Sequence, residues 1–89
     1  MNEFAAPVHH VYIVRCADGT LYTGYALNPS ERVDTHNVGR GAKYTASRRP
    51  VALVYSESFE SKSDALKREL ELKRWTRARK EALLSSPSA

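Results

Sequence analysis

The sequence predicts one small α+β domain, in which a single sheet and a few helices share a modest core. The chain has 89 residues, a length that suits one domain without a second. Three stretches are rich in β-branched and aromatic residues, as strands are. Two later segments begin at residues that cap helices well. We expect the strands at Val8–Cys16, Thr20–Tyr25 and Val51–Phe59.

The loop between the first two strands decides which side chains share a face of the sheet. A two-residue loop would place Tyr22 on the face away from Tyr12. A three-residue loop at Ala17–Gly19, with its glycine in the left-handed conformation, instead pairs Tyr12 with Gly24. We adopt this second register. It puts both phenols on one face and leaves a gap without a side chain opposite Tyr12.

Capping residues and glycine define the helices. Asn28, followed by Pro29, starts a helix that runs to about Val38 and stops at Gly39. A serine at 61 or 63 caps a longer helix after the third strand. The other helical segments are expected at Lys43–Ala46, Lys62–Trp75 and Arg77–Leu84.

The two ends of the chain are expected to lie outside the folded domain, which spans residues 8–84. Residues 1–7 should be a flexible N-terminus, and residues 85–89 a disordered tail. The single cysteine, Cys16, excludes an internal disulfide and a cysteine-based zinc site, and it fits a reducing cytosol. No apolar run approaches the ~20 residues of a membrane span. We therefore expect a cytoplasmic protein that is not in a membrane.

Basic residues are concentrated in two parts of the chain. The sequence has 14 Lys and Arg residues against 10 Asp and Glu residues, a net charge of +4. Residues 40–49 hold four basic residues and no acidic one, and residues 62–89 hold eight basic and four acidic residues. This distribution favours an anionic partner such as a nucleic acid. A solvated helix face next to a basic loop would give the same pattern.

One acidic residue falls where the helix after the third strand should be apolar. At 100° per residue, Glu69 lies inside the arc that contains Leu66 and Leu70. A buried carboxylate is costly unless it is paired or bound to a cation. Two interpretations stay open: an ion pair with Lys73 one turn later, or a metal ligand or catalytic carboxylate at the sheet surface.

Four other polar residues could take part in chemistry. Arg32 and His36 share a helix face, where the arginine fork suits a phosphate and the histidine can exchange a proton. Tyr12 and Tyr22 are strand aromatics whose plainer role is packing. A free phenol, with a pKa near ~10, is a poor base unless a cation or metal is close. Arg32 and His36 could equally be exposed residues of an ordinary amphipathic helix.

The order and spacing of these residues resemble the GIY-YIG nuclease family. The tripeptide His10-Val11-Tyr12 stands where the family has Gly-Ile-Tyr, and Tyr22-Thr23-Gly24 keeps the outer residues of the second motif. The ten-residue step from the second tyrosine to Arg32 and the four-residue step to His36 match the family pattern. Two further stretches look like the small stand-alone bacterial members: Gly41–Thr45 and Ala65–Glu69.

The resemblance implies a three-stranded antiparallel sheet with helices around it, and an endonuclease that depends on Mg²⁺ or Mn²⁺. Glu69 would be the single metal ligand from the protein, with water and phosphate oxygens completing the shell. Arg32 would hold the scissile phosphate. Tyr12 or Tyr22 would help to deprotonate the attacking water, and His36 would support that step or orient a tyrosine.

A chain of this size has no separate DNA-binding domain, so its own surface would contact the substrate. Contacts to phosphates are salt-sensitive and indifferent to sequence. We therefore expect selection of structure, as in single-stranded or flexible DNA, and a role in DNA repair or processing. The residues expected to bind nucleic acid are Arg40, Lys43, Tyr44, Arg48, Arg49, Lys67 and Lys73.

Other functions stay open at this point. The chain could bind nucleic acid without cutting it, or act on RNA, and a small protein-interaction domain with structural tyrosines is a third possibility. A monomer or a weak homodimer is expected, since a module of this size could pair in order to cut two strands.

Overall fold

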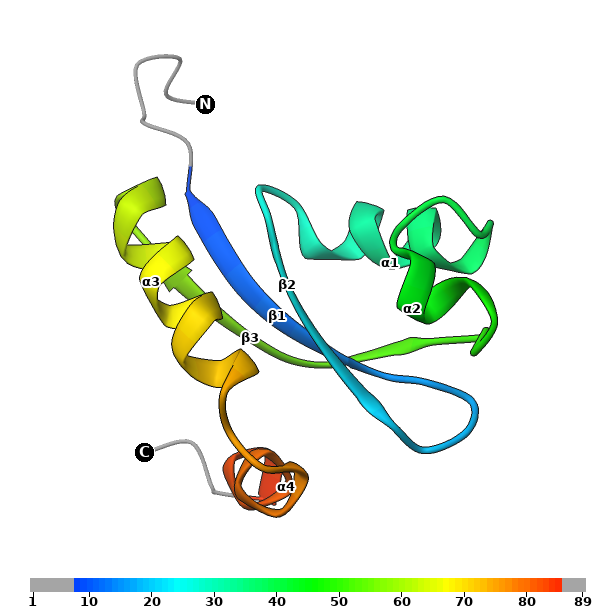
Figure 1. Ribbon diagram of the computed structural model, residues 1–89. Helices are drawn as coiled ribbons and strands as arrows, with labels where there is room; N and C mark the ends of the chain where they lie inside the picture. The colour runs from blue at the N-terminus through cyan, green and yellow to red at the C-terminus, as the bar shows by residue number, and fades with distance from the viewer. Residues whose placement is uncertain (1–7, 86–89) are drawn as a thin grey trace.

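The computed structural model describes residues 8–85, which form three strands and four helices (Figure 1). The strands make one sheet in the order β2-β1-β3, and both neighbouring pairs are antiparallel. This confirms the predicted α+β class with a three-stranded antiparallel sheet. The elements are β1 His9–Arg15, β2 Leu21–Ala26, α1 Pro29–Asn37, α2 Lys43–Ala46, β3 Ala52–Phe59, α3 Lys62–Lys73 and α4 Arg77–Ser85.

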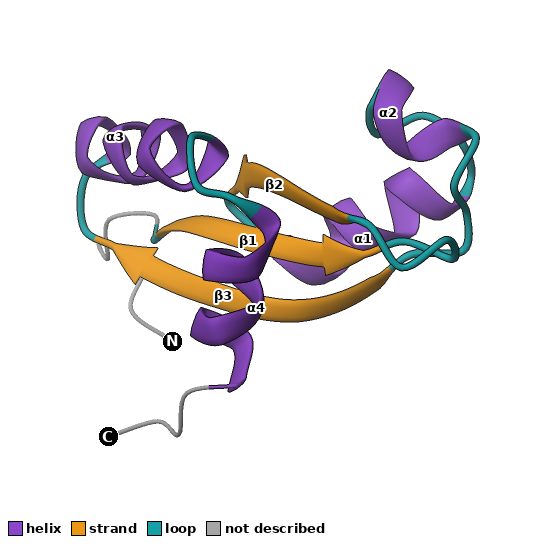
Figure 2. Ribbon diagram, turned by 60° about the horizontal axis from the view of Figure 1, so that its bottom comes forward, coloured by secondary structure: helices purple, strands orange, loops and turns teal. Residues whose placement is uncertain are grey.

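Each face of the sheet carries its own hydrophobic cluster. α1 and α3 lie on opposite sides of the strands (Figure 1), and β1 runs in the middle of the sheet (Figure 2). On the α1 side, Val33 packs against a buried cluster that includes Tyr12 and Val14. On the α3 side, Leu72 and Ile13 belong to a second buried cluster. Alternating residues of β1 therefore contribute to both clusters, as the two-residue period of a strand requires.

The hairpin between β1 and β2 has the three-residue loop that the sequence predicts. Gly19 has a φ of +87°, and the backbone N–H of Cys16 donates to the carbonyl of Thr20 at 2.8 Å. Tyr12 lies opposite Gly24 in the resulting register. The predicted register is thus confirmed. A one-residue slip would have put the two phenols on different faces.

The start of α1 follows the predicted signals. The Asn28 side chain accepts a hydrogen bond from the backbone N–H of Glu31 at 3.2 Å, and Pro29 occupies the first helical position. Gly39, with a φ of +86°, follows the end of the helix. Because these signals are local, they predict the end of α1 well. The helix ends at Asn37, one residue before the predicted Val38.

The buried side of α3 differs from the predicted one. Leu66 and Leu70 are 41% and 54% exposed, whereas Leu72 is buried. The prediction of a broad apolar arc is therefore wrong. The helix is rotated so that Arg68 donates to the carboxylate of Glu57 on β3, with an Nε–Oε1 distance of 3.0 Å. This rotation leaves the two exposed leucines on the outer flank of the helix.

The ends of the helices in the second half also differ slightly from the prediction. α3 stops at Lys73, two residues before the predicted Trp75. α4 includes Ser85, where the sequence predicted the start of a disordered tail, and the rest of that tail and residues 1–7 lie outside the described residues. Within residues 8–85, no helix is long and apolar enough to cross a membrane.

Candidate active site

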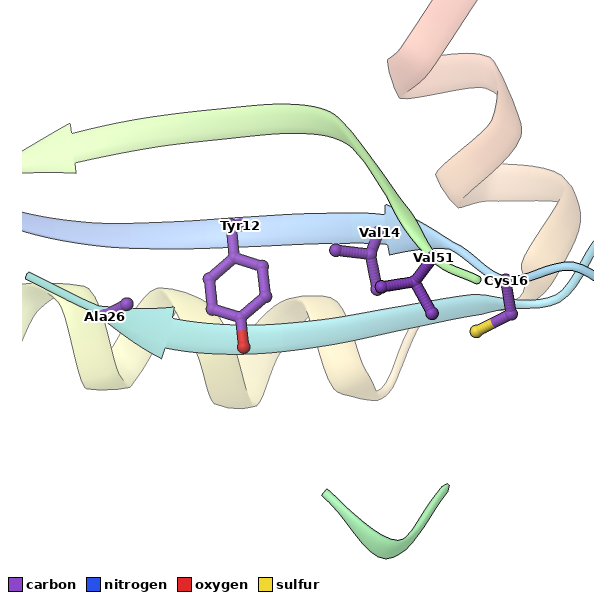
Figure 3. Close-up of a cluster of buried hydrophobic side chains, with 5 residues drawn as sticks. All are labelled: Tyr12, Val14, Cys16, Ala26 and Val51. Carbon is purple, nitrogen blue, oxygen red and sulfur yellow. The ribbon is translucent and has the colours of Figure 1, made fainter. Parts of the chain in front are cut away.

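The site is centred on Tyr12, which extends from the middle strand towards the edge of the sheet. Its ring crosses β2 (Figure 3), and only 2% of the residue is exposed. Gly24 lies directly opposite, and a Cβ atom there would meet the Tyr12 hydroxyl oxygen at 2.5 Å. The glycine therefore provides the gap through which the phenol passes, as the sequence predicts.

A chain of hydrogen bonds fixes the proton positions behind this phenol. The Tyr12 hydroxyl is 2.7 Å from Nε2 of His36, and Nδ1 of His36 is 2.7 Å from Oγ1 of Thr45. The Thr45 hydroxyl donates to the carbonyl of Ala42 at 3.1 Å. Its one proton is thus used, so its oxygen accepts from His36. The neutral imidazole then carries its proton on Nδ1, and Tyr12 donates to the free Nε2.

The backbone before α2 packs directly on the imidazole. A Cβ atom on Gly41 would lie 2.1 Å from Nδ1 of His36. His36 and Thr45 are 1% and 0% exposed. Sequence reasoning assigned no role to Gly41 or Thr45, although both lie in the stretch that resembles the family. The signal was a glycine four residues before a threonine, which by itself predicts nothing about an imidazole from another helix.

The second phenol connects this centre to the surface. The ring centroids of Tyr22 and His36 are 5.3 Å apart in an edge-to-face arrangement. On its outer side Tyr22 stacks on Tyr44, with centroids 5.9 Å apart and an interplanar angle of 25°. The Arg48 guanidinium lies 3.9 Å from the centroid of the Tyr44 ring. Two of the residues predicted to bind nucleic acid, Tyr44 and Arg48, therefore border the site.

Burial and nearby charges shift the pKa values of both Tyr12 and His36. Burial raises the pKa of the Tyr12 phenol far above its ordinary value, and the nearby Tyr22 and Glu69 raise it further, while Arg32 opposes them. Burial also lowers the pKa of His36, with a smaller contribution from the positive charge of Arg32. The phenol and the imidazole are both neutral near pH 7 as a result.

Glu69 lies on α3, which packs on the face of the sheet opposite α1 and also contacts the edge strand β2. Its side chain is 17% exposed, and one carboxylate oxygen is 3.1 Å from Nζ of Lys73. The ion pair considered from the sequence is therefore present, and the carboxylate also acts on Tyr12. Residues 8–85 hold no cluster of three or more metal-ligating side chains. A lone carboxylate ligand, with water and phosphate oxygens completing the shell, would suit Mg²⁺ or Mn²⁺ better than a soft metal.

Among the other predicted binding residues, Lys73 pairs with Glu69, whereas the rest are engaged elsewhere or face outward. The Arg49 guanidinium donates to the carbonyls of Ala46 and Asn37, at 2.8 and 3.3 Å, so its donors hold the loop together. Lys67 is exposed and points about 160° away from Glu69 around α3. Arg40 and Lys43 are exposed on the segment that leads into α2.

The candidate site thus combines two phenols, an arginine, a histidine and a glutamate, which come from β1, β2, α1 and α3. The family description of the GIY-YIG catalytic domain matches residues 8–82. The chain therefore belongs to the GIY-YIG family, whose domains are generally nucleases.

Small proteins of the same single-domain type are similar to the chain. UPF0213 proteins of Staphylococcus aureus strains Mu50 and N315 are each 60% identical over 76 residues, which cover 85% of this chain and 93% of theirs. The solution structure of the UPF0213 protein BH0048 from Bacillus halodurans is 45% identical, with a TM-score of 0.58, and the match covers 88% of this chain and 83% of that one. These similarities support the fold and the family.

Adding one carbon at Gly41 should disturb the site. Gly41→Ala should lower the unfolding free energy by about 1–3 kcal/mol, because the new methyl group overlaps the His36 ring and forces it to move. Denaturant unfolding and the NMR signals of the His36 ring would measure both effects. Ser47→Ala, in the same loop but exposed, is the control. Wild-type stability with an unchanged His36 environment would contradict the packing described here.

Thr45 should determine which nitrogen of His36 carries the proton. Thr45→Val keeps the shape but leaves the buried Nδ1–H without an acceptor, which should cost about 1–3 kcal/mol and reduce the population with a free Nε2. Thr45→Ser should restore the wild-type tautomer. ¹⁵N NMR of the imidazole distinguishes the two nitrogens. The same tautomer in wild type and Thr45→Val would show that the hydroxyl does not set it.

Proposed function

We propose that this protein is a metal-dependent endonuclease that hydrolyses DNA phosphodiester bonds and selects structure over sequence. The supporting observation is the hydrogen bond from the buried Tyr12 phenol to His36, and the pKa of this phenol also responds to the charges of Arg32 and Glu69. A role in DNA repair or processing in the cytoplasm fits the net positive charge and the single buried thiol. Metal dependence, substrate and pathway are parts of this proposal.

Two side chains are suited to hold the reacting phosphate, Glu69 through a metal ion and Arg32 directly. Glu69 would hold a Mg²⁺ or Mn²⁺ ion, which when bound neutralises phosphate charge and polarises the attacking water. Arg32 is exposed on α1 and is close enough to Tyr12 and His36 to lower the pKa of each. Its guanidinium can donate two parallel hydrogen bonds to a phosphate and stabilise the charge that develops there.

Tyr12 serves better than Tyr22 as the group that receives the proton of the attacking water. With its pKa raised, the Tyr12 phenol is protonated at neutral pH and cannot act as a phenolate base. It can accept a proton from water only if it passes its own proton to Nε2 of His36, 2.7 Å away. The imidazole then becomes the positively charged end of the transfer, while the water oxygen bonds to phosphorus and the leaving oxygen departs.

One observation favours binding without catalysis as the second candidate. Lys73 already neutralises Glu69, so an ion would have to compete with its ammonium group. Lys73 is about half exposed, and surface pairs of this spacing contribute only about 0.3–0.5 kcal/mol. A divalent ion that also binds a phosphate could therefore displace the Lys73 ammonium from Glu69 at little cost in free energy. The experiment below separates the two candidates.

Glu69→Gln should abolish cutting and leave the fold intact. Labelled single-stranded, duplex and branched DNA, and RNA, incubated with Mg²⁺ or Mn²⁺, should be cut by the wild type. The variant should be slower by about 100-fold or more, because the metal loses its protein ligand. EDTA should have the same effect. Glu71→Gln, on the same helix with a more exposed carboxylate, is the control and should cut normally.

Two results would count against the enzyme. Salt-sensitive binding without cutting of any of these substrates would favour the non-catalytic module. Cutting that survives both Glu69→Gln and EDTA would remove the metal from the proposal. Cutting of RNA alone would move the substrate class from DNA to RNA.

Activity should fall on the acidic side of neutrality. Since His36 must be neutral to accept the Tyr12 proton, kcat/KM should decrease as the pH drops through the pKa of His36, which burial holds below its ordinary value of 6.5. The acid limb should therefore have its midpoint below 6.5 and coincide with the NMR titration of His36. In Arg32→Gln, the titration midpoint should move upward. An acid limb centred above 6.5 would contradict the proposed proton acceptor.

A further inference from the structure

A groove with basic residues on two walls adjoins the proposed active site. It has a volume of about 460 Å³ and lies between the end of β2, the first turns of α1 and the start of α3. Arg32 of α1 and Lys62 of α3 both line it, together with Tyr25 of β2. Because α1 and α3 lie on opposite sides of the sheet (Figure 1), the two cations approach the groove from different elements.

Arg32 connects this groove to the catalytic centre. The same guanidinium lowers the pKa of Tyr12 and of His36, so the groove begins where the scissile phosphate would bind. On the other wall, Lys62 and Glu69 are seven residues apart on α3. Seven residues are about two helical turns, which puts both side chains on one side of the helix about 10 Å apart. α3 therefore presents a carboxylate at the metal position and a cation farther along the edge of β2.

Neither cation of the groove forms an ion pair within the described part of the chain, whereas Arg68 pairs with two carboxylates. The acidic residue that lines the groove is Glu31, whose carboxylate accepts from the side-chain amide of Asn28 at 2.8 Å. Its negative charge lies at the N-terminus of α1, where an anion would otherwise bind. The lining therefore carries two positive charges and one negative charge, and the space between Arg32 and Lys62 is the part of the groove that favours a phosphate.

Tyr25 gives the groove a fixed aromatic surface. Its hydroxyl is 2.7 Å from Nδ1 of His9, and the two rings stack with centroids 5.9 Å apart and an interplanar angle of 19°. The Lys62 ammonium lies 5.7 Å from the centroid of the Tyr25 ring. An aromatic ring that is fixed next to a cation can contact the sugar or base of a nucleotide while the cation neutralises the phosphate of that nucleotide.

We propose that this groove binds the nucleotide next to the scissile bond, with Lys62 holding the phosphate that follows the one bound by Arg32. The inference rests on the proposed function, since it takes the reacting phosphate to lie at Arg32 and Glu69. It names a phosphodiester strand as the ligand of a surface to which the sequence assigned no role. Lys62, His9 and Tyr25 were absent from the predicted binding residues.

Binding of a six-nucleotide, fluorescein-labelled single strand tests the groove, with DNA and RNA as separate arms and EDTA present to prevent cutting. Lys62→Ala should reduce the slope of log K against log salt by about 0.7, the value for one phosphate contact on a single strand. That change corresponds to about fivefold in affinity for each tenfold change in salt. Lys62→Arg should restore the slope. Amide signals of Tyr25, Arg32 and Lys62 should shift when the oligonucleotide is added.

Arg74→Ala is the control, because it removes one exposed positive charge at the end of the same helix, about 120° around its axis from Lys62. Equal losses in Lys62→Ala and Arg74→Ala would reduce the effect to net charge and overturn the groove, as would an unchanged slope in Lys62→Ala. The two proposals can fail separately. A Lys62-specific slope without any cutting supports the groove and counts against the enzyme. Cutting that requires Glu69 but does not change in Lys62→Ala supports the enzyme and counts against the groove.

Discussion

The hydrogen bond between Tyr12 and His36 links the packing of this small domain to its proposed chemistry. Both groups are almost completely buried, so an unmade bond between them would cost about 1–3 kcal/mol. The bond exists because Gly24 lets the phenol cross β2 and because Gly41 lets the backbone approach the imidazole. The same polar contacts that join β1, α1 and α2 thus also orient the proposed proton acceptor, so loss of one should affect both stability and the proposed catalysis.

The features that were predictable from the sequence depend on short-range rules. The placement of Tyr12 and Tyr22 on one face follows from the two-residue period of strands and from the turn at Gly19. The start of α1 follows from the Asn28 cap. By contrast, the rotation of α3 could not be read from its apolar residues, because Leu66 and Leu70 stay exposed and only Ala65 and Leu72 join the buried cluster under the sheet.

Long-range contacts also account for the parts of the site that the sequence did not indicate. Thr45 matters because α2 packs on α1 and brings its hydroxyl to His36, and neither helix contains a sign of that contact. The distribution of basic residues in the sequence was uninformative for the same reason. Arg48 lies over the Tyr44 ring, but it also pairs with Asp18 and donates to the Tyr44 carbonyl. The donors of Arg49 bind backbone carbonyls. Composition counts both as positive charges, although each already has partners within the domain.

The position of β2 at the margin of the sheet has a consequence for how a substrate would enter. With the order β2-β1-β3, one side of β2 has no neighbouring strand, and the buried Tyr12 ring lies across that strand (Figure 3). Under the proposed function, a DNA strand would approach this margin from the side, and the ends of the strand would play no part in the approach. A closed circle of DNA should then be cut as readily as a linear molecule.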